Sequence, residues 1–251
     1  MTKPDLYVFA ISHYCEKACW ALDYLGIDFA ISHVAPGLHV ALAKKLGAPH
    51  SSVPILVEDG QVVQGSAAII DWADAATAGS KRLTPQTAGQ DCVALEERLD
   101  DVIGVHVRRY YYSEALVEHS PTVKPIFIEN LGLLQKLLVG SMWSVVRKRM
   151  IKGMDLGSAQ GQDSKSIIEG ELQWLDGLLS DGRQFLIGEK FSRVDLTAAS
   201  LLAPLAIPME HPTYSGLVVP PRVADDLLAW KNRPVINWVR EIYRQYRSAS
   251  D

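Results

Sequence analysis

The first eighty residues alternate between strand-like and helix-like patterns of hydrophobic positions. An apolar run over residues 6–11 ends at Ser12, and beyond Tyr14 the apolar side chains recur at helical spacing as far as Leu25. Gly26 follows, and glycine is the residue that most often ends a helix in the left-handed conformation. Because serine is a favoured capping residue, the pattern predicts that a strand ends and a helix begins at Ser12.

The same reading predicts further elements before residue 80. They are a strand at residues 28–34, a helix at Leu38–Leu46, a hairpin of residues 53–57 and 61–63 around an acidic turn, and a helix that begins at Ser66. Pro54 lies inside an apolar strand although proline cannot donate to a sheet, which indicates a strand entrance, an edge strand or a cis peptide bond. The predicted order is β-α-β-α-β-β-α.

Strand signals almost disappear in the rest of the chain. We predict an α/β domain at residues 1–79, a polar linker at residues 80–86 and an all-helical domain at residues 87–251. The helices are expected at residues 86–116, 123–152, 164–180, 192–206, 221–231 and 234–247. Residues 154–164 contain glycines and few apolar side chains, which predicts a surface loop. Ser192 and Asp195 have the spacing of a capping box.

Composition and charge narrow the classes of partner. With 48% hydrophobic residues, the 251-residue chain can bury a sizeable core. Its net charge is −4, with Lys and Arg interleaved among Asp and Glu, so we expect no nucleic-acid partner. No apolar run is long enough to span a bilayer, and the first residues lack the apolar stretch of a signal peptide. We therefore expect a cytoplasmic protein with no membrane partner.

The helix start at Ser12 is the best candidate for chemistry. Free backbone N–H groups and a partial positive charge at a helix N-terminus favour an anion such as a thiolate, although a serine there is also commonly a simple cap. Cys15, on the first turn, is either a second reactive group or a small packing residue. The odd set of Cys15, Cys19 and Cys92 indicates reduced thiols, and it lacks the neighbouring ligands of a metal site, so no metal is expected.

Several stretches resemble motifs of the cytosolic glutathione transferases. Residues 12–15 (Ser-His-Tyr-Cys) resemble a glutaredoxin-type Cys-Pro-Tyr-Cys motif whose first position is serine, as in the serine-type transferases. Residues 52–56 resemble the family's Val-Pro-x-Leu strand with a cis proline, and residues 65–69 resemble its Glu/Gln-Ser-x-Ala-Ile motif. Residues 185–196, with Ala-Trp at 229–230 and Arg-Pro at 233–234, resemble its capping-box and C-terminal signatures.

This resemblance implies a fold, an activity and a set of site residues. The fold is a thioredoxin-like α/β N-terminal domain followed by an all-α C-terminal domain, usually in a homodimer. The activity is conjugation of the glutathione thiolate, glutathione being a co-substrate, to a small hydrophobic or aromatic electrophile, as in detoxification. Ser12 corresponds to the catalytic group. The residues that correspond to the glutathione-binding groups are His39, Val53, Pro54, Gly65 and Ser66.

The chain also departs from the family pattern. Gly65 stands where the family has an acidic or amide side chain, and Gln64 is expected to face the opposite side if the strand continues. His13 replaces the usual proline and is either a ligand contact or a solvated side chain. His39 matches the family only briefly, so a surface histidine is an equal alternative.

The second substrate is expected between the two domains, against the helix of residues 86–116. An aromatic and basic set lies there and on the following helix, although the same residues could equally be core: Arg108, Arg109, Tyr110, Tyr111, Tyr112, Met142, Trp143 and Arg147. Three readings of the function follow. The first is a glutathione transferase, the second a glutathione-dependent oxidoreductase or isomerase, and the third a non-catalytic binding or regulatory protein on the same fold.

Overall fold

The computed structural model describes residues 3–77, 81–86, 89–128, 130–214 and 217–247. The chain forms two compact units, one of Met1–Leu83 with Lys124–Val146 and the other of Thr84–Val123 with Arg147–Asp251. Ser80 of the predicted linker, and Thr87 and Ala88 at the predicted start of the helical domain, lie outside the described residues. The predicted domain limits therefore remain a prediction, and Lys124–Val146, which we had assigned to the helical domain, packs with the first unit.

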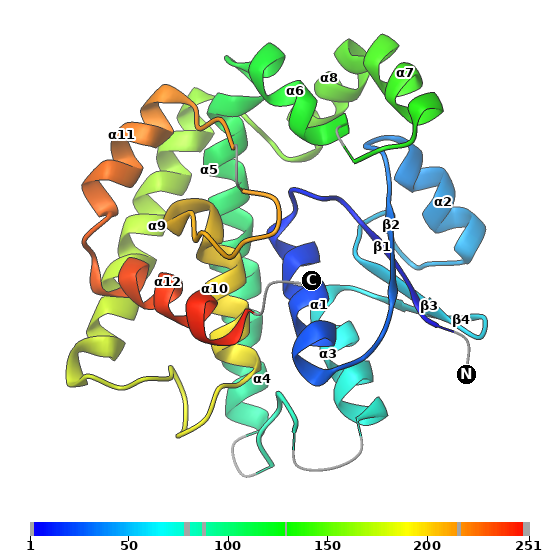
Figure 1. The fold of residues 1–251 in the computed structure, drawn as a ribbon. Coiled ribbons are helices and arrows are strands. Elements are labelled where there is room, and N and C mark those ends of the chain that lie inside the picture. The colour runs from blue at the N-terminus through cyan, green and yellow to red at the C-terminus, as the bar shows by residue number, and fades with distance from the viewer. Residues whose placement is uncertain (1–2, 78–80, 87–88, 129, 215–216, 248–251) are drawn as a thin grey trace. The chain divides into compact units, whose positions relative to one another are not determined.

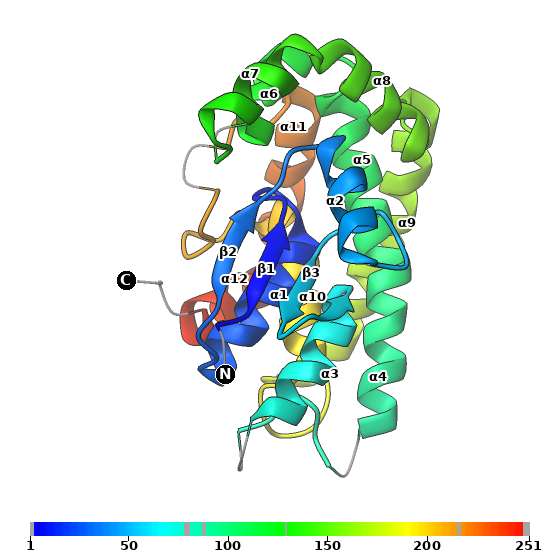
Figure 2. The same ribbon diagram turned by 90° about the vertical axis from the view of Figure 1, so that its right-hand side faces the viewer.

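A four-stranded mixed sheet forms the centre of the first unit. Its strands are β1 (Asp5–Val8), β2 (Ala30–His33), β3 (Ile55–Glu58) and β4 (Gln61–Gln64). The spatial order is β2-β1-β3-β4, with β2 parallel to β1, and with β3 antiparallel to both β1 and β4. Figure 2 shows β1 between β2 and β3. The predicted hairpin is therefore confirmed, and the β1–β2 pair needs the crossover that the intervening helix supplies.

Helices cover both faces of this sheet. They are α1 (His13–Leu25), α2 (Leu38–Leu46) and α3 (Ser66–Ala76), and Figure 1 shows α1 and α3 together on one face with α2 on the other. The core between them is fully buried and apolar, and it includes Leu6, Trp20, Leu22, Ile55, Leu56, Ile69 and Ile70. The β-α-β-α-β-β-α order predicted from the sequence is confirmed, and the domain is thioredoxin-like.

The predicted single helix at residues 123–152 is wrong. The structure has three helices there: α6 (Ser120–Ile128), α7 (Leu133–Ser141) and α8 (Trp143–Gly153). Pro125 lies inside α6, where it removes a backbone donor, and Gly132 takes an extended conformation (φ −63°, ψ 155°) before α7. The apolar positions keep helical spacing through these breaks, so the pattern alone does not show where one helix ends and the next begins.

All the regular secondary structure of the second unit is helical among its described residues. It contains α4 (Gly89–Arg98), a π-helical segment η1 (Leu99–Gly104), α5 (Val105–Ala115), α9 (Ser158–Leu178), a short η2 (Leu179–Asp181), α10 (Arg193–Ala206), α11 (Pro221–Trp230) and α12 (Pro234–Tyr246). Every residue of α10 is buried, and this helix contacts α4, η1, α5 and α12. The predicted all-helical class is confirmed, with α10 as the central element.

The predicted surface loop at residues 154–164 is wrong from Ser158 onward, where α9 begins. Gly161 explains the error. It lies where α9 packs closely on α5, and a Cβ at this position would be 2.9 Å from the Cβ of Ser113. This glycine therefore serves close helix packing, whereas we had interpreted it as a sign of a loop.

The capping box that opens α10 is confirmed. The Asp195 carboxylate accepts hydrogen bonds from the backbone N–H of Leu186 at 2.7 Å and of Ser192 at 2.9 Å, and from the Ser192 hydroxyl at 2.8 Å. Burial raises the pKa of Asp195 to about 6, although these donors oppose the shift. Among the described residues, no helix combines the length and the apolar character that a membrane crossing requires.

Candidate functional site

Ser12 caps α1 as the sequence predicted. Its backbone is extended (φ −79°, ψ 119°), and its hydroxyl oxygen accepts a hydrogen bond from the Cys15 N–H at 3.4 Å. Its own N–H donates to the Phe9 carbonyl at 3.1 Å, which orders the turn between β1 and α1. The side chain remains partly exposed. The Cys15 N–H uses an acceptor site of the hydroxyl, so this cap does not consume the O–H proton of Ser12.

Cys15 is a packing residue in this structure. Only 2% of its surface is exposed, and burial raises the pKa of its thiol to about 11 despite the opposing hydrogen bond with Ser12. Cys19 and Cys92 are also free and buried. A reactive cysteine needs a lowered pKa and access to solvent, and Cys15 has neither.

The sheet register brings most of the predicted glutathione-binding positions to one end of the sheet. Ile55 at the start of β3 lies opposite Tyr7 near the end of β1, and it also lies opposite Gln64 at the end of β4. The Val53–Pro54 peptide bond, just before β3, is cis as predicted. The Gly65 N–H donates to the Pro54 carbonyl at 3.0 Å. The Val53–Pro54 segment, the start of α3 and the turn that follows β1 are therefore neighbours.

Gly65 and Ser66 form the junction between β4 and α3. Gly65 has φ +97°, in the region that favours glycine, and Ser66 is the first residue of α3 and only 5% exposed. A residue with a side chain would be strained at this φ, so the conformation seen here suits glycine and not the acidic or amide residue of the family motif. The hydroxyl and N–H of Ser66 stand at a helix N-terminus, where an anion is favoured.

Gln64 is a site-forming residue that our sequence reasoning missed. Its side chain folds onto the loop before Val53, where it exchanges two hydrogen bonds with the backbone of His50 and donates a third to the Ser52 carbonyl. Strand alternation correctly separated Gln64 from the position of Gly65. It carried no signal that the amide reaches a loop fourteen residues earlier in the chain.

His39 lies on α2 against the turn that leads to Ser12. Its ring meets the Phe9 ring edge-on, with centroids 4.9 Å apart, and its Nδ1 accepts a hydrogen bond from the Gly37 N–H at 3.0 Å. Burial lowers the pKa of His39, and the backbone of Ala35 opposes that shift. The neutral ring therefore carries its proton on Nε2, which can donate one hydrogen bond to a carboxylate.

His13 is not the solvated side chain that we considered. It is 5% exposed, and its ring lies 4.6 Å from the ring of Tyr14. A buried aromatic ring takes the place of the family's proline at the first position of α1.

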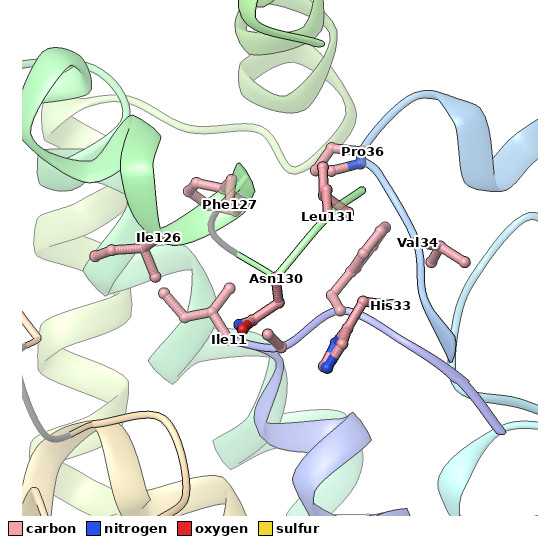
Figure 3. A pocket seen from close by; sticks show the side chains of 10 residues that line it. Ile11, His33, Val34, Pro36, Ile126, Phe127, Asn130 and Leu131 are labelled. Carbon is pink, nitrogen blue, oxygen red and sulfur yellow. The ribbon is translucent and has the colours of Figure 1, made fainter. Parts of the chain in front are cut away.

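A small pocket lies beside the turn that precedes Ser12. Its volume is about 10 Å³, room for about one water molecule. Figure 3 shows its lining, in which His33 and Asn130 are the polar side chains: Phe9, Ala10, Ile11, His33, Val34, Pro36, Ile126, Phe127, Asn130 and Leu131. The His33 Nδ1 is buried and has no hydrogen-bond partner among the described residues. The lining is therefore mostly apolar with His33 and Asn130 as its polar side chains, and an organic molecule would need it to open.

Most of the residues proposed for the second substrate have structural partners instead. The Tyr110 hydroxyl donates to Asp226 at 2.7 Å, Arg109 pairs with Asp155, and Arg147 donates to the Leu116 and Val117 carbonyls. Tyr110 and Tyr111 are buried, and burial raises the pKa of both phenols. For these residues the packing interpretation fits the structure better.

One group of described side chains has the spacing of metal ligands: Glu114, Glu118 and His119. Arg222 already supplies the positive charge at this position, since its guanidinium pairs with both glutamates and its N–H donates to Glu114. Glu114 also accepts from the Val223 N–H and so caps the first turn of α11. The group is accounted for as a helix cap with its counter-charge.

Residues 6–81 match the family described as glutathione S-transferase, N-terminal domain. This match assigns residues 6–81 to the glutathione S-transferase N-terminal domain family. No curated protein sequence matches the chain significantly.

Solved structures extend the likeness to the glutathione transferase fold of the whole chain. A glutathione S-transferase of Ceriporiopsis subvermispora, solved with glutathione, is 14% identical and has a TM-score of 0.67, with all of both chains covered. The transferase GSTFuA3 of Phanerochaete chrysosporium gives 15% identity and a TM-score of 0.67 over the same coverage. The β-etherase LigF of Sphingobium sp. strain SYK-6 gives 18% identity and a TM-score of 0.60, covering 96% of this chain and 99% of LigF. At these identities the likeness establishes the fold.

Proposed function

We propose that this protein is a serine-type glutathione transferase, which joins the glutathione thiolate to a small hydrophobic or aromatic electrophile. The observation that carries the proposal is Ser12 itself: a partly exposed hydroxyl at the N-terminus of α1, whose oxygen accepts from the Cys15 N–H in a bond that does not use the O–H proton. The match of residues 6–81 to the glutathione S-transferase N-terminal domain supports glutathione as the ligand.

The energy required of Ser12 is within reach of one hydrogen bond. A glutathione thiol has a pKa of about 8.5, so little thiolate exists at pH 7. Lowering that pKa by about two units requires roughly 2.7 kcal/mol of preference for the thiolate. A hydrogen bond to a charged group supplies about 1.5–3 kcal/mol, and the helix dipole adds about 0.3–1 kcal/mol. In the reaction, the thiol proton leaves to solvent, the sulfur forms a bond to carbon, and the leaving group departs with the former bonding pair.

The tripeptide has a plausible set of partners around this sulfur position. The backbone of Val53 is suited to pair with the cysteinyl backbone, as an added strand would. Ser66 at the start of α3 suits the γ-glutamyl carboxylate, and the Nε2–H of His39 suits the glycyl carboxylate. Gly65 provides no side chain to the γ-glutamyl end, so we expect weaker glutathione binding than the family motif would give.

The apolar pocket beside Ile11 is the best candidate for the electrophile. It adjoins the turn that leads to Ser12, and His33 offers one polar atom for a carbonyl, hydroxyl or ether oxygen of the substrate. Since LigF is described as a β-etherase, an ether is a second substrate to test beside an aryl halide. A redox reaction through Cys15 is disfavoured, because that thiol is buried and its pKa is raised.

Activity with glutathione and an aryl halide tests the proposal in three variants. Ser12→Ala should lower kcat/KM by about 100-fold and shift its pH profile upward by about two units, in line with the loss of the thiolate hydrogen bond. Ser12→Thr keeps both the hydroxyl and the cap, so it should retain most activity. Cys15→Ser should also remain active. If Ser12→Ala is active and Cys15→Ser is not, the thiolate role of Ser12 is wrong and the redox alternative replaces it.

Loss of the cap could also affect stability, so each variant needs a control for folding. Ser12→Ala is expected to lose about 1 kcal/mol of unfolding free energy through the missing cap. Calorimetric binding of glutathione at a pH where the thiol is protonated separates the two effects. Unchanged binding with lost turnover supports the proposal, whereas an absence of glutathione binding in the wild-type protein favours the non-catalytic alternative.

A further inference from the structure

Helix α7 exposes its apolar side chains to solvent instead of burying them. Leu133 and Leu134 are each 81% exposed, Leu137 is 73% exposed and Leu138 is 42% exposed. The opposite side of the helix makes the contact with the first unit, where Val139 packs with Ala35 and Leu131. The amphipathic pattern is thus inverted relative to a helix of a monomeric soluble protein, whose exposed face is polar.

Exposed apolar residues continue along the chain past the end of α7. Met142, the residue between α7 and α8, is 46% exposed, and Val145 on α8 is 43% exposed. A contiguous run of this kind marks an interaction surface, since single exposed apolar residues are normal but extended patches are not. We call this set the α7 face and define it as Leu133, Leu134, Leu137, Leu138, Met142 and Val145.

The segment that carries the α7 face is strongly basic in an otherwise acidic protein. Residues 130–154 contain five Lys and Arg residues and no Asp or Glu, although the whole chain has a net charge of −4. Lys148, Arg149 and Lys152 are exposed, and on α8 they follow Val145 by three, four and seven residues. That spacing places them on the same side of one helix as Val145.

We propose that the α7 face docks the protein onto an anionic lipid surface. Leucines on one side of a short helix, with lysines and arginines close by in the chain, form the pattern of helices that lie in the plane of a membrane interface. At nine residues α7 is about 14 Å long, too short to cross a bilayer but long enough to lie in its surface layer. Long cationic side chains reach from that layer to the lipid phosphates.

The charge distribution favours lipid over a second copy of the chain. In a twofold contact through the α7 face, each copy presents the same surface to the other, so two basic segments without a single carboxylate would be brought together. Like charges across an interface disfavour association. An anionic lipid surface can bury the leucines in its outer layer and pair the lysines and arginines with its phosphates. This inference is independent of the proposed glutathione chemistry, because it uses none of the residues assigned to it.

Co-sedimentation of the full-length protein with lipid vesicles tests the proposal. The probes are vesicles of phosphatidylcholine alone and vesicles in which about a third of the lipid is phosphatidylglycerol. We expect binding to the anionic vesicles, at least about tenfold weaker binding to the neutral ones, and loss of binding at high salt. Leu134→Glu, and separately Lys148→Glu with Arg149→Glu, should each weaken binding by about tenfold or more.

Two matched controls keep this test specific. Leu228→Glu makes the same change at a leucine on α11 that is 61% exposed, and Lys44→Glu with Lys45→Glu reverses an adjacent exposed pair on α2. Neither should change vesicle binding by more than about twofold. The proposal is overturned if the wild-type protein binds neither vesicle, if it binds both equally, or if the controls lose binding as the α7 and α8 variants do. A concentration-dependent dimer that Leu134→Glu dissociates, without lipid binding, would assign the α7 face to a second copy instead.

Discussion

The side-chain amide of Gln64 holds both backbone groups of His50. Its Oε1 accepts from the His50 N–H at 2.9 Å, and its Nε2 donates to the His50 carbonyl at 2.8 Å and to the Ser52 carbonyl at 2.6 Å. Gln64 is the last residue of β4, so these bonds connect the sheet to the loop before Val53. The Gln64 side chain therefore helps to position the segment that we propose to pair with glutathione, together with the bond from the Gly65 N–H to the Pro54 carbonyl.

Gln64→Ala should loosen this loop and weaken glutathione binding. Three hydrogen bonds are lost in a partly exposed setting, for which we expect a loss of about 1–2 kcal/mol in unfolding free energy. Amide hydrogen exchange at His50 should accelerate, and the Kd for glutathione should rise by about three- to tenfold. Gln61→Ala, on the same strand but exposed, is the control. Unchanged exchange at His50 would show that the loop is held by other contacts.

Gln64→Glu tests whether the donors of the amide matter. A carboxylate keeps the acceptor for the His50 N–H but sets a negative oxygen against the carbonyls of His50 and Ser52. We expect this variant to bind glutathione less tightly than Gln64→Ala, as measured by calorimetry. Equal or tighter binding by Gln64→Glu would mean that the His50 N–H bond alone positions the loop.

Local sequence patterns predicted the helices and strands of the thioredoxin-like domain. They did not predict features that depend on contacts between distant segments. Ser12, Gly26 and the alternation around Pro54 each act through residues close in the chain, so the caps and the hairpin could be predicted. The pattern at Pro54 left a cis bond as one of three alternatives, and the family resemblance favoured it. The breaks around Gly132, the close packing at Gly161 and the reach of Gln64 depend on contacts between distant segments. Periodicity carries no information on those contacts.

Burial of the three cysteines predicts unreactive thiols in the native protein. Burial raises the pKa of Cys15 to about 11 and also raises that of Cys92, so almost no thiolate forms on either at pH 7.5. An aromatic disulfide reagent should label none of the three within minutes, and all of them after unfolding in denaturant. Rapid labelling of one native thiol, mapped to Cys15 by mass spectrometry, would revive a reactive role for it.

Asp195 should give the protein a distinctive pH dependence. Its folded pKa of about 6 lies above the ordinary value of 3.8, so the folded state holds the proton more tightly than the unfolded chain does. Stability from this group is therefore present below about pH 4 and is lost as the pH rises through 6. Asp195→Asn is destabilised because its amide would face a backbone donor, but it does not titrate. The difference in unfolding free energy between the wild-type protein and Asp195→Asn should therefore decrease by on the order of 2–3 kcal/mol between pH 4 and pH 7.

Urea unfolding of both proteins over this pH range measures the difference. Asp225→Asn serves as the control, since Asp225 is an exposed aspartate on α11 and its removal should leave the pH dependence of the wild-type protein intact. If Asp195→Asn and the wild-type protein run parallel from pH 4 to pH 7, then the buried carboxylate does not titrate as its surroundings indicate.

Substitution by alanine should change the unfolding free energy in opposite directions at two glycines that have equal space around them. A Cβ at Gly65 or at Gly170 would meet no atom within 4 Å, so neither substitution creates a clash. Gly65 has φ +97°, where an alanine is strained, and Gly65→Ala should lower the unfolding free energy by about 1–2 kcal/mol. Gly170 lies inside α9, where alanine is favoured, and Gly170→Ala should raise the unfolding free energy by about 0.5–1 kcal/mol.

Gly65→Gln restores the amide of the family motif but retains the backbone strain. It should therefore be destabilised like Gly65→Ala, and a Gly65→Ala as stable as the wild-type protein would mean that the β4–α3 junction can adopt another backbone conformation.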